Sequence, residues 1–204
     1  MRRNTLGVLG AALSVALVFA AIATAETVKG THGDDVLTGT EAADTIIAKK
    51  GDDQVDGLGE ADKLFGGRGS DDLDGGDGDD RLMGGSDDDQ LAGGLGDDSL
   101  RGKGGSDDLD GGEGNDFLNG GKSADEADAG AGDDTVRSRG DGKAADTIAC
   151  GDGNDTVFAD KADVVADDCE NVLRTGPKNG QGQAKNGQGK VKGPKGEGPE
   201  APQA

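Results

Sequence analysis

Two consecutive nine-residue stretches decide the fold: residues 66–74 (GGRGSDDLD) and residues 75–83 (GGDGDDRLM). In both, glycine occupies the first, second and fourth positions, aspartate the sixth and leucine the eighth. Self-similarity at a fixed period is the sequence signature of a repeat architecture. The chain is therefore expected to build its structure from one short unit used many times.

This unit recurs in two coupled registers over most of the chain. The first register consists of twelve aspartates spaced nine residues apart. The second consists of the aliphatic residues two positions after each aspartate, which are all large except Ala127. The frame returns at Asp146 and Asp155 after an insertion of three residues, and Glu26 lies in the same frame upstream. A solvated acidic surface or a disordered acidic tract would not require the aliphatic register. The two registers together favour an ordered repeat.

Each position of the unit is expected to have a structural role. The three glycines are expected to adopt φ > 0, which only glycine does without steric cost. The last three residues are expected to form a short strand, in which Leu82 points inward and its neighbours Arg81 and Met83 point outward. Two units would make one 18-residue turn with a strand on each face, so stacked turns would form two parallel sheets around a thin aliphatic core.

The unit resembles the repeat of the RTX, or haemolysin-type calcium-binding, family, G-G-x-G-x-D-x-U-x, where U is a large aliphatic residue. The resemblance covers about residues 26–165. It implies an all-β fold, a right-handed parallel β-roll (a solenoid) of 18-residue turns with Ca²⁺ held in the turns.

Charge supports the same expectation. The chain carries a net charge of −21, and residues 26–173 alone carry −27. Stacking would place carboxylates of alternate units about 4.8 Å apart, where they repel one another. Ca²⁺ takes about six to eight oxygen ligands from carboxylates and backbone carbonyls, so roughly ten ions between successive turns would remove most of this repulsion.

The predicted calcium ligands are the sixth-position aspartates, arranged as two stacks. One stack contains Asp35, Asp53, Asp71, Asp89, Asp107 and Asp125, the other contains Asp44, Asp62, Asp80, Asp98, Asp116 and Asp134, and Asp155 is a further candidate.

The first 25 residues have the features of a secretory signal peptide. Arg2 and Arg3 precede an apolar run, and the run ends in Ala23-Thr24-Ala25, a small-x-small cleavage pattern. An uncleaved membrane anchor is the alternative. The arginine pair also leaves twin-arginine export open beside the general secretory route. We expect a secreted, extracellular protein that is not transmembrane when mature.

The two cysteines, Cys150 and Cys169, fit a single disulfide in an oxidising compartment. Two free thiols are the alternative. Residues 146–173 continue the repeat with shifted spacing and are expected to cap the last turn of the 26–145 repeat region. Their Cys-Gly-x-Gly-x-Asp and Cys-Glu pattern resembles secreted RTX-repeat proteins of the actinobacterial type.

Beyond the cap, residues 174–204 are rich in Gly, Pro, Lys, Gln and Asn and are expected to form a disordered basic tail. It would serve as a solubilising segment, or would touch an anionic cell-wall polymer or the acidic roll itself.

Composition and motifs also limit the function. The acidic charge argues against nucleic acid as a partner, because a phosphate backbone requires Lys and Arg. The single histidine, His32, excludes a HExxH zinc-protease site, and no G-x-S-x-G motif occurs. We expect a calcium-binding structural or interaction protein rather than an enzyme. A calcium-dependent adhesin, a β-roll enzyme with a basic, aromatic cleft, and an ice-binding roll are the alternatives; the sequence gives no sign of such a cleft.

Overall fold

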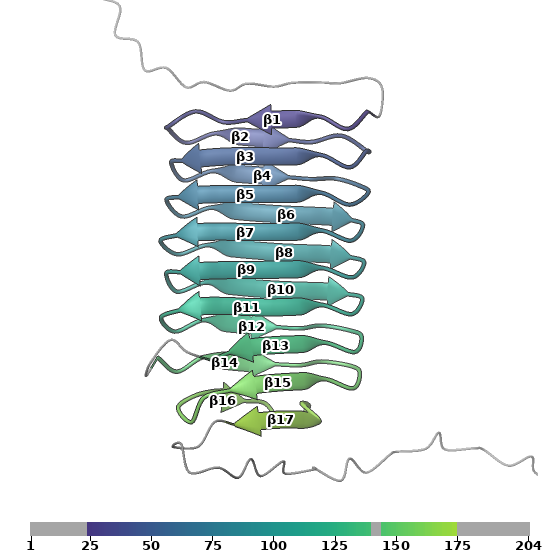
Figure 1. Ribbon diagram of the computed structural model, residues 1–204, viewed down its shortest axis with the longest axis vertical. Coiled ribbons are helices and arrows are strands. Elements are labelled where there is room, and N and C mark those ends of the chain that lie inside the picture. Colours follow the sequence, from purple (N-terminus) through teal and green to yellow (C-terminus); the bar gives the residue numbers. More distant parts are fainter. Residues whose placement is uncertain (1–23, 140–143, 175–204) are drawn as a thin grey trace, which may run out of the picture.

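The computed structural model describes residues 24–139 and 144–174. These residues form 17 β-strands and no helix, arranged as a straight column of stacked turns (Figure 1). No part of the described chain forms a helix of the length and apolar character needed to cross a membrane. Most of the predicted signal peptide and all of the predicted tail after Arg174 lie outside the described residues.

The strands alternate between two parallel sheets. The odd-numbered strands form a nine-stranded sheet, called sheet A: β1 (Thr27–Lys29), β3 (Thr45–Lys50), β5 (Lys63–Arg68), β7 (Arg81–Ser86), β9 (Ser99–Gly104), β11 (Phe117–Lys122), β13 (Thr135–Ser138), β15 (Thr156–Ala159) and β17 (Asn171–Arg174). The even-numbered strands form an eight-stranded sheet, called sheet B: β2 (Val36–Thr38), β4 (Gln54–Asp56), β6 (Asp72–Asp77), β8 (Gln90–Leu95), β10 (Asp108–Glu113), β12 (Glu126–Asp128), β14 (Thr147–Ala149) and β16 (Val164–Val165).

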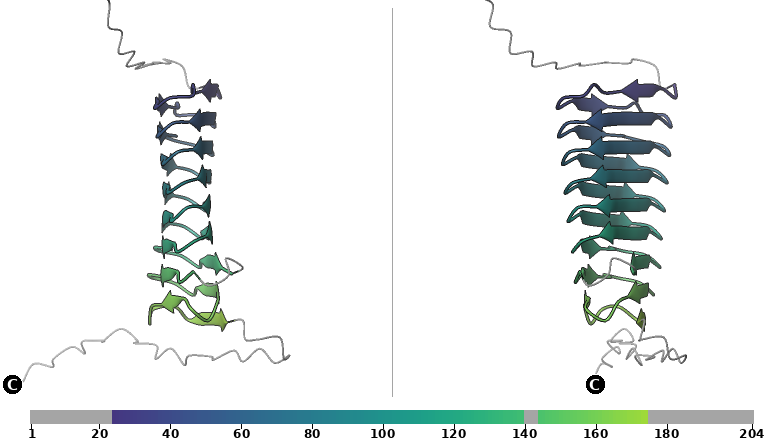
Figure 2. Two further views of the ribbon diagram at one scale, coloured as in Figure 1. Left: turned by 90° about the vertical axis from the view of Figure 1, so that its left-hand side faces the viewer. Right: turned by 60° about the vertical axis from the view of Figure 1, so that its left-hand side comes forward.

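Successive strands of one sheet are offset by two units. Leu82 of β7 pairs with Leu64 of β5, 18 residues earlier, and the same offset joins β6 to β8. Every named strand pair is parallel, and the two sheets stand back to back along the column (Figure 2). The predicted parallel solenoid of 18-residue turns is confirmed.

Most central strands are longer than the three residues predicted. β7 runs from Arg81 to Ser86 and includes the first three residues of the next unit. The prediction was wrong there because the first glycine of each unit, such as Gly84, is buried and continues the extended chain instead of starting the turn. Three-residue strands occur only toward the ends of the column, as in β2 and β14.

Glycines at the second and fourth positions adopt the positive φ expected of them, for example Gly76 (φ 96°) and Gly78 (φ 131°). All non-glycine residues with positive φ in the described chain also fall at these two positions: Lys49, Leu58, Glu60, Asp87, Lys103 and Ser123. The prediction was wrong for the first glycine, which is not among the positive-φ residues. That position needs glycine for space, because a Cβ on Gly84 would overlap the carboxylate of Asp89.

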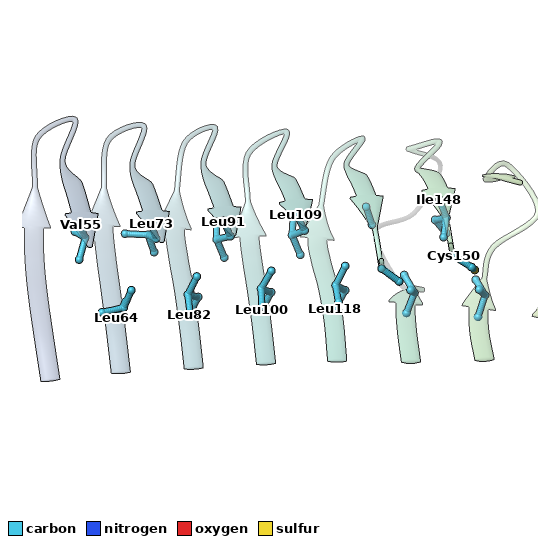
Figure 3. Packing of buried hydrophobic residues seen from close by; sticks show 14 of the residues in the cluster. Val55, Leu64, Leu73, Leu82, Leu91, Leu100, Leu109, Leu118, Ile148 and Cys150 are labelled. Atoms are coloured by element: carbon cyan, nitrogen blue, oxygen red, sulfur yellow. The ribbon is translucent and has the colours of Figure 1, made fainter. Parts of the chain in front are cut away.

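The hydrophobic core is one aliphatic side chain deep on each side. Leu64, Leu82 and Leu100 of sheet A face Leu73 and Leu91 of sheet B across the column (Figure 3). All five are buried, and full burial of one leucine side chain stabilises a fold by about 1.5–3 kcal/mol. Within residues 24–139 and 144–174 the core has no second layer, so the turns at the column's edges must contribute to stability.

The C-terminal strands continue both sheets past the insertion. β14 pairs with β12 at an offset of 21 residues, and β16 and β17 then pair with β14 and β15 at shorter offsets. Cys150 and Cys169 form a disulfide with a Cα–Cα distance of 5.2 Å, which links the turn after β14 to the turn before β17. The free-thiol alternative does not hold in this structure.

Candidate metal sites

The structure places all the predicted ligand aspartates in two columns, one along each edge of the roll. Each residue directly precedes a strand, as Asp80 precedes β7 of sheet A and Asp89 precedes β8 of sheet B. Each side chain is at most 6% exposed. Aspartate is almost never this buried unless its charge is compensated.

From Asp44 onward, one carboxylate oxygen of each column aspartate holds the preceding turn, whereas the carboxylate of Asp35 accepts from Thr31 of its own turn. The amide of Asp62 donates to Oδ1 of Asp80 at 2.6 Å, and the amide of Asp80 donates to Oδ1 of Asp98 at 2.7 Å. The pattern repeats along both columns. Each side chain therefore reaches back toward the N-terminus and satisfies a buried amide that would otherwise lack an acceptor.

Oδ2 of Asp35 and of Asp44, at the start of the columns, accepts from the amides of Thr31 and Thr40. Farther along the columns, the second oxygen, Oδ2, has no hydrogen-bond partner within the described residues. This holds for buried Oδ2 atoms in both columns: those of Asp53, Asp62, Asp71, Asp80, Asp89, Asp98, Asp107, Asp116, Asp134 and Asp155. Leaving a buried acceptor unsatisfied costs about 1–3 kcal/mol, and more when the acceptor is charged. A repeated set of such atoms indicates a partner that is neither protein backbone nor side chain.

In the column that contains Asp80, a backbone carbonyl of the next turn shares the space beside Oδ2. A Cβ built on Gly75 would overlap both Oδ2 of Asp80 and the carbonyl oxygen of Gly93. The same relation holds one turn later between Gly93, Asp98 and Gly111. Carboxylate and carbonyl oxygens converging from adjacent turns are the donor set that Ca²⁺ prefers. The residues present therefore fit a calcium ion.

The electrostatics agree with this fit. Burial, together with the smaller effect of neighbouring carboxylates of the same column, raises the pKa of Asp89 and of Asp98 to about 7, against the lowering effect of the backbone hydrogen bond. Burial likewise raises the pKa to about 6 at other column positions: Asp62, Asp71, Asp80, Asp107 and Asp134. Without a cation, the columns therefore resist full ionisation near neutral pH.

Sequence reasoning missed how the columns end. The amide of Asp146, which continues the Asp35 column, donates to Oδ1 of Asp163 at 3.3 Å. The amide of Asp155, in the other column, donates to Oε2 of Glu170 at 3.0 Å. The signal was present as Asp163-x-Val165 and Glu170-x-Val172, which keep the acid-x-aliphatic spacing although the nine-residue period is lost.

A second ladder at the fifth position was also missed. The amide of Asp97 donates to Oδ1 of Asp79 at 3.0 Å, and the amide of Asn115 donates to Oδ1 of Asp97 at 2.7 Å. These side chains are exposed and lie outside the buried columns. We call these contacts the outer ladder and those made by Oδ1 of the buried columns the inner ladder. The side chains of the outer ladder reach toward the C-terminus and those of the inner ladder toward the N-terminus, so each turn is bonded to both of its neighbours.

Comparison with known families agrees with the geometry. The model of the RTX calcium-binding nonapeptide repeat (4 copies) matches residues 23–55, 38–73, 65–100, 74–109, 101–136 and 141–163. No similar sequence was found among curated proteins. Because the matched segments cover more than half of the chain and coincide with the turns described above, the chain belongs to the family of RTX calcium-binding nonapeptide repeat proteins.

Proposed function

We propose that this chain is a secreted structural protein whose roll folds outside the cell when Ca²⁺ fills the spaces between adjacent turns. The observation that carries the proposal is the repeated, buried Oδ2 atom without a protein partner. In each space, Oδ2 would contribute a ligand while Oδ1 keeps the carboxylate oriented through its amide contact, and in the column that contains Asp80 a carbonyl oxygen of the next turn would contribute another. Bound Ca²⁺ would supply the positive charge that lets the carboxylates stay ionised while buried.

The number of ions follows from the columns. Six aspartates in each predicted stack leave five spaces, which gives roughly ten ions for the two stacks. Roughly ten divalent ions would bring the charge of residues 26–173 from −27 to about −7. The columns continue through Asp146 and Asp155, and the buried Oδ2 of Asp155 offers a further position of the same type.

The proposed location rests on sequence features and on the disulfide. Residues 1–25 have the pattern of an export signal, and the Cys150–Cys169 bridge suits an oxidising compartment. Calcium sites of extracellular modules bind at about 10⁻⁴–10⁻³ M, well above cytosolic calcium. The charge of the repeats would keep the chain expanded before export.

Equilibrium dialysis of the purified protein against CaCl₂, with bound metal measured by mass spectrometry, tests the assignment. About ten calcium ions per chain are expected, with much weaker uptake of Mg²⁺, which demands tighter octahedral geometry. Binding of only one or two ions per chain, or equal uptake of both metals, would refute the assignment.

A further inference from the structure

Charge is divided between the outer faces of the two sheets. The outward residues of sheet A, at the seventh and ninth positions of each unit, include no acid and five bases: Lys29, Lys63, Arg81, Arg101 and Arg137. The outward residues of sheet B include no base and seven acids: Asp56, Asp72, Asp74, Asp108, Asp110, Glu126 and Asp128. We call these surfaces the basic face and the acidic face. A basic face without any carboxylate is unexpected on a chain of net charge −21.

Aromatic rings hold part of the basic face in place. The guanidinium groups of Arg101 and Arg137 lie 5.5 and 5.6 Å from the ring centroid of Phe117. Arg137 and Arg139 lie 5.4 and 4.9 Å from that of Phe158. A guanidinium group within about 6 Å of a ring centroid is attracted to the face of the ring. The result is a preorganised surface of arginines and rings, which lowers the entropic cost of docking.

We propose that the basic face docks onto the acidic face of a second copy of this chain. Charge complementarity supports this partner, since both halves of the contact are present on one molecule. The strands of both sheets have the same spacing of about 4.8 Å, so when one strand of sheet A lies over a strand of sheet B, the neighbouring strands also lie over one another. Two sheets can pack face to face with strands nearly aligned. The proposal goes beyond calcium binding but requires the folded roll.

One antiparallel alignment of the two columns matches the charges strand by strand. When β9 lies over β10 of the second copy, the equal order of strands in the two sheets puts β7 over β12 and β13 over β6. Each of these sheet A strands carries one arginine, and each facing sheet B strand carries two outward acids. The pairs are Arg101 over Asp108 and Asp110, Arg81 over Glu126 and Asp128, and Arg137 over Asp72 and Asp74.

The same alignment also matches shape and apolar surface. It puts Phe117 of β11 over β8, at a shallow hollow of about 300 Å³ that Leu91 and Ala92 line together with acids of the neighbouring strands, which also face the arginines beside Phe117. At one end of the interface Ile47 meets Val164, which is 61% exposed. At the other end, where β17 lies over β2, Leu173 meets Val36, which is 49% exposed. Burial of these apolar side chains would stabilise the pair in addition to the ion pairs.

The area fits a weak, concentration-dependent contact. The eight facing strands of sheet B are two to six residues long, about 13 Å on average, and lie about 4.8 Å apart, which gives roughly 500 Å² per face, below the ~800 Å² per partner of a standard interface. The contact is heterologous, because it joins the basic face of one copy to the acidic face of another. One acidic and one basic face remain free in every complex, so the association continues as an open stack.

Sedimentation velocity of the calcium-loaded protein tests the proposal. At low salt the full chain is expected to form a concentration-dependent series of dimers and larger species. In about 1 M NaCl, where the Debye length is about 3 Å, the series should shrink toward monomer. Two variants then separate the faces: Arg81→Gln/Arg101→Gln on the basic face and Asp108→Asn/Asp110→Asn on the acidic face. Circular dichroism in calcium verifies that each variant is folded.

Each variant alone is expected to be monomeric, whereas their equimolar mixture should form a dimer and nothing larger, because only one competent interface remains. Lys63→Gln is the matched control. Lys63 is also an exposed cation of sheet A, but the alignment puts it over β14, whose outward residues are Thr147 and Ala149, so association should be unchanged.

A folded parent protein that stays monomeric at low salt would overturn the proposal, as would a mixture of variants that forms no dimer. A loss of association in Lys63→Gln equal to that in the Arg81→Gln/Arg101→Gln variant would overturn the alignment. It would indicate unspecific attraction, of the kind expected if the basic face instead serves an anionic polymer.

Discussion

The amide of Asp155 donates to Oε2 of Glu170, in the same way as the amide of Asp80 donates to Oδ1 of Asp98. Glu170 thus ends the buried column of sheet A, with one more methylene than aspartate to span a turn of 15 rather than 18 residues. Because every inner acid reaches back to the preceding turn, each turn depends on the one that follows it. The last acid is therefore a structural part of the cap.

Replacing this last acid should loosen the end of the roll. In Glu170→Ala the part-buried amide of Asp155 loses its acceptor, which costs about 1–3 kcal/mol. Hydrogen exchange in β15 and β17 should become faster while β7 to β10 stay protected. Glu113→Ala is the control, since Glu113 is exposed and no side-chain bond is seen for it in the described chain. Equal protection of β15 in both variants would contradict this role.

Calcium affinity should depend on Oδ2 rather than on the ladder contact. Asp98→Asn keeps an acceptor for the amide of Asp80 but replaces the unpaired Oδ2 with an amide group. Isothermal titration calorimetry should show weaker and less cooperative calcium binding than in the parent protein, because two sites share this residue.

Asp97→Asn is the matched control for that experiment. Asp97 is exposed and uses its side chain in the outer ladder, where Asn115 already does the same with an amide oxygen. Calcium binding should therefore stay close to that of the parent. Equal losses in Asp97→Asn and Asp98→Asn would show that the inner column has been assigned wrongly.

Metal-free protein should gain structure on acidification. The folded pKa values of about 6 to 7 at Asp89 and Asp98 and their neighbours lie above the unfolded value of about 3.9. Folding therefore favours the protonated carboxyls. This stabilisation is complete below about pH 4 and is lost as the pH rises through about 6 to 7. Circular dichroism in EDTA should show β structure appearing between about pH 7 and pH 5. A spectrum that does not change over this range would count against the buried, like-charged columns.

The disulfide should stabilise the cap locally. A bridge closing a loop of 19 residues contributes about 3 kcal/mol on the chain-entropy model. Cys150→Ser should increase proteolysis within residues 146–174 in calcium, while the number of ions bound by the central turns stays the same. Unchanged cleavage in this segment, or a loss of most bound calcium, would contradict a local role.

The sequence predicts the regular part of this fold well, for a physical reason. A unit that repeats without a slip from Asp35 to Asp134 fixes the register of every strand, so that locating Leu82 in the core also locates Leu64 and Leu100. Alternation then sends Arg81 and Met83 outward. The predicted ligand aspartates came from the same periodicity.

Features that depend on contacts between turns were harder to predict. The first position of most units is glycine because the carboxylate five residues later fills the space of a Cβ. The outer ladder forms because each fifth-position carboxylate meets an amide 18 residues away in the sequence. Glu170 was missed because the cap changes the period. The charge division between the faces was also missed, because neighbouring units in the sequence belong to opposite sheets. A search for a basic, aromatic surface must therefore compare every second unit.

Calcium titration of metal-free protein at about pH 7.5, followed by far-ultraviolet circular dichroism and by hydrodynamic radius, tests the central claim most directly. The account predicts an expanded chain with little β signal in EDTA. Millimolar Ca²⁺ should produce β signal and compaction together in one cooperative transition, and EDTA should reverse both. A compact β structure that persists in EDTA at this pH would contradict the claim that calcium between the aspartate columns is what folds the roll.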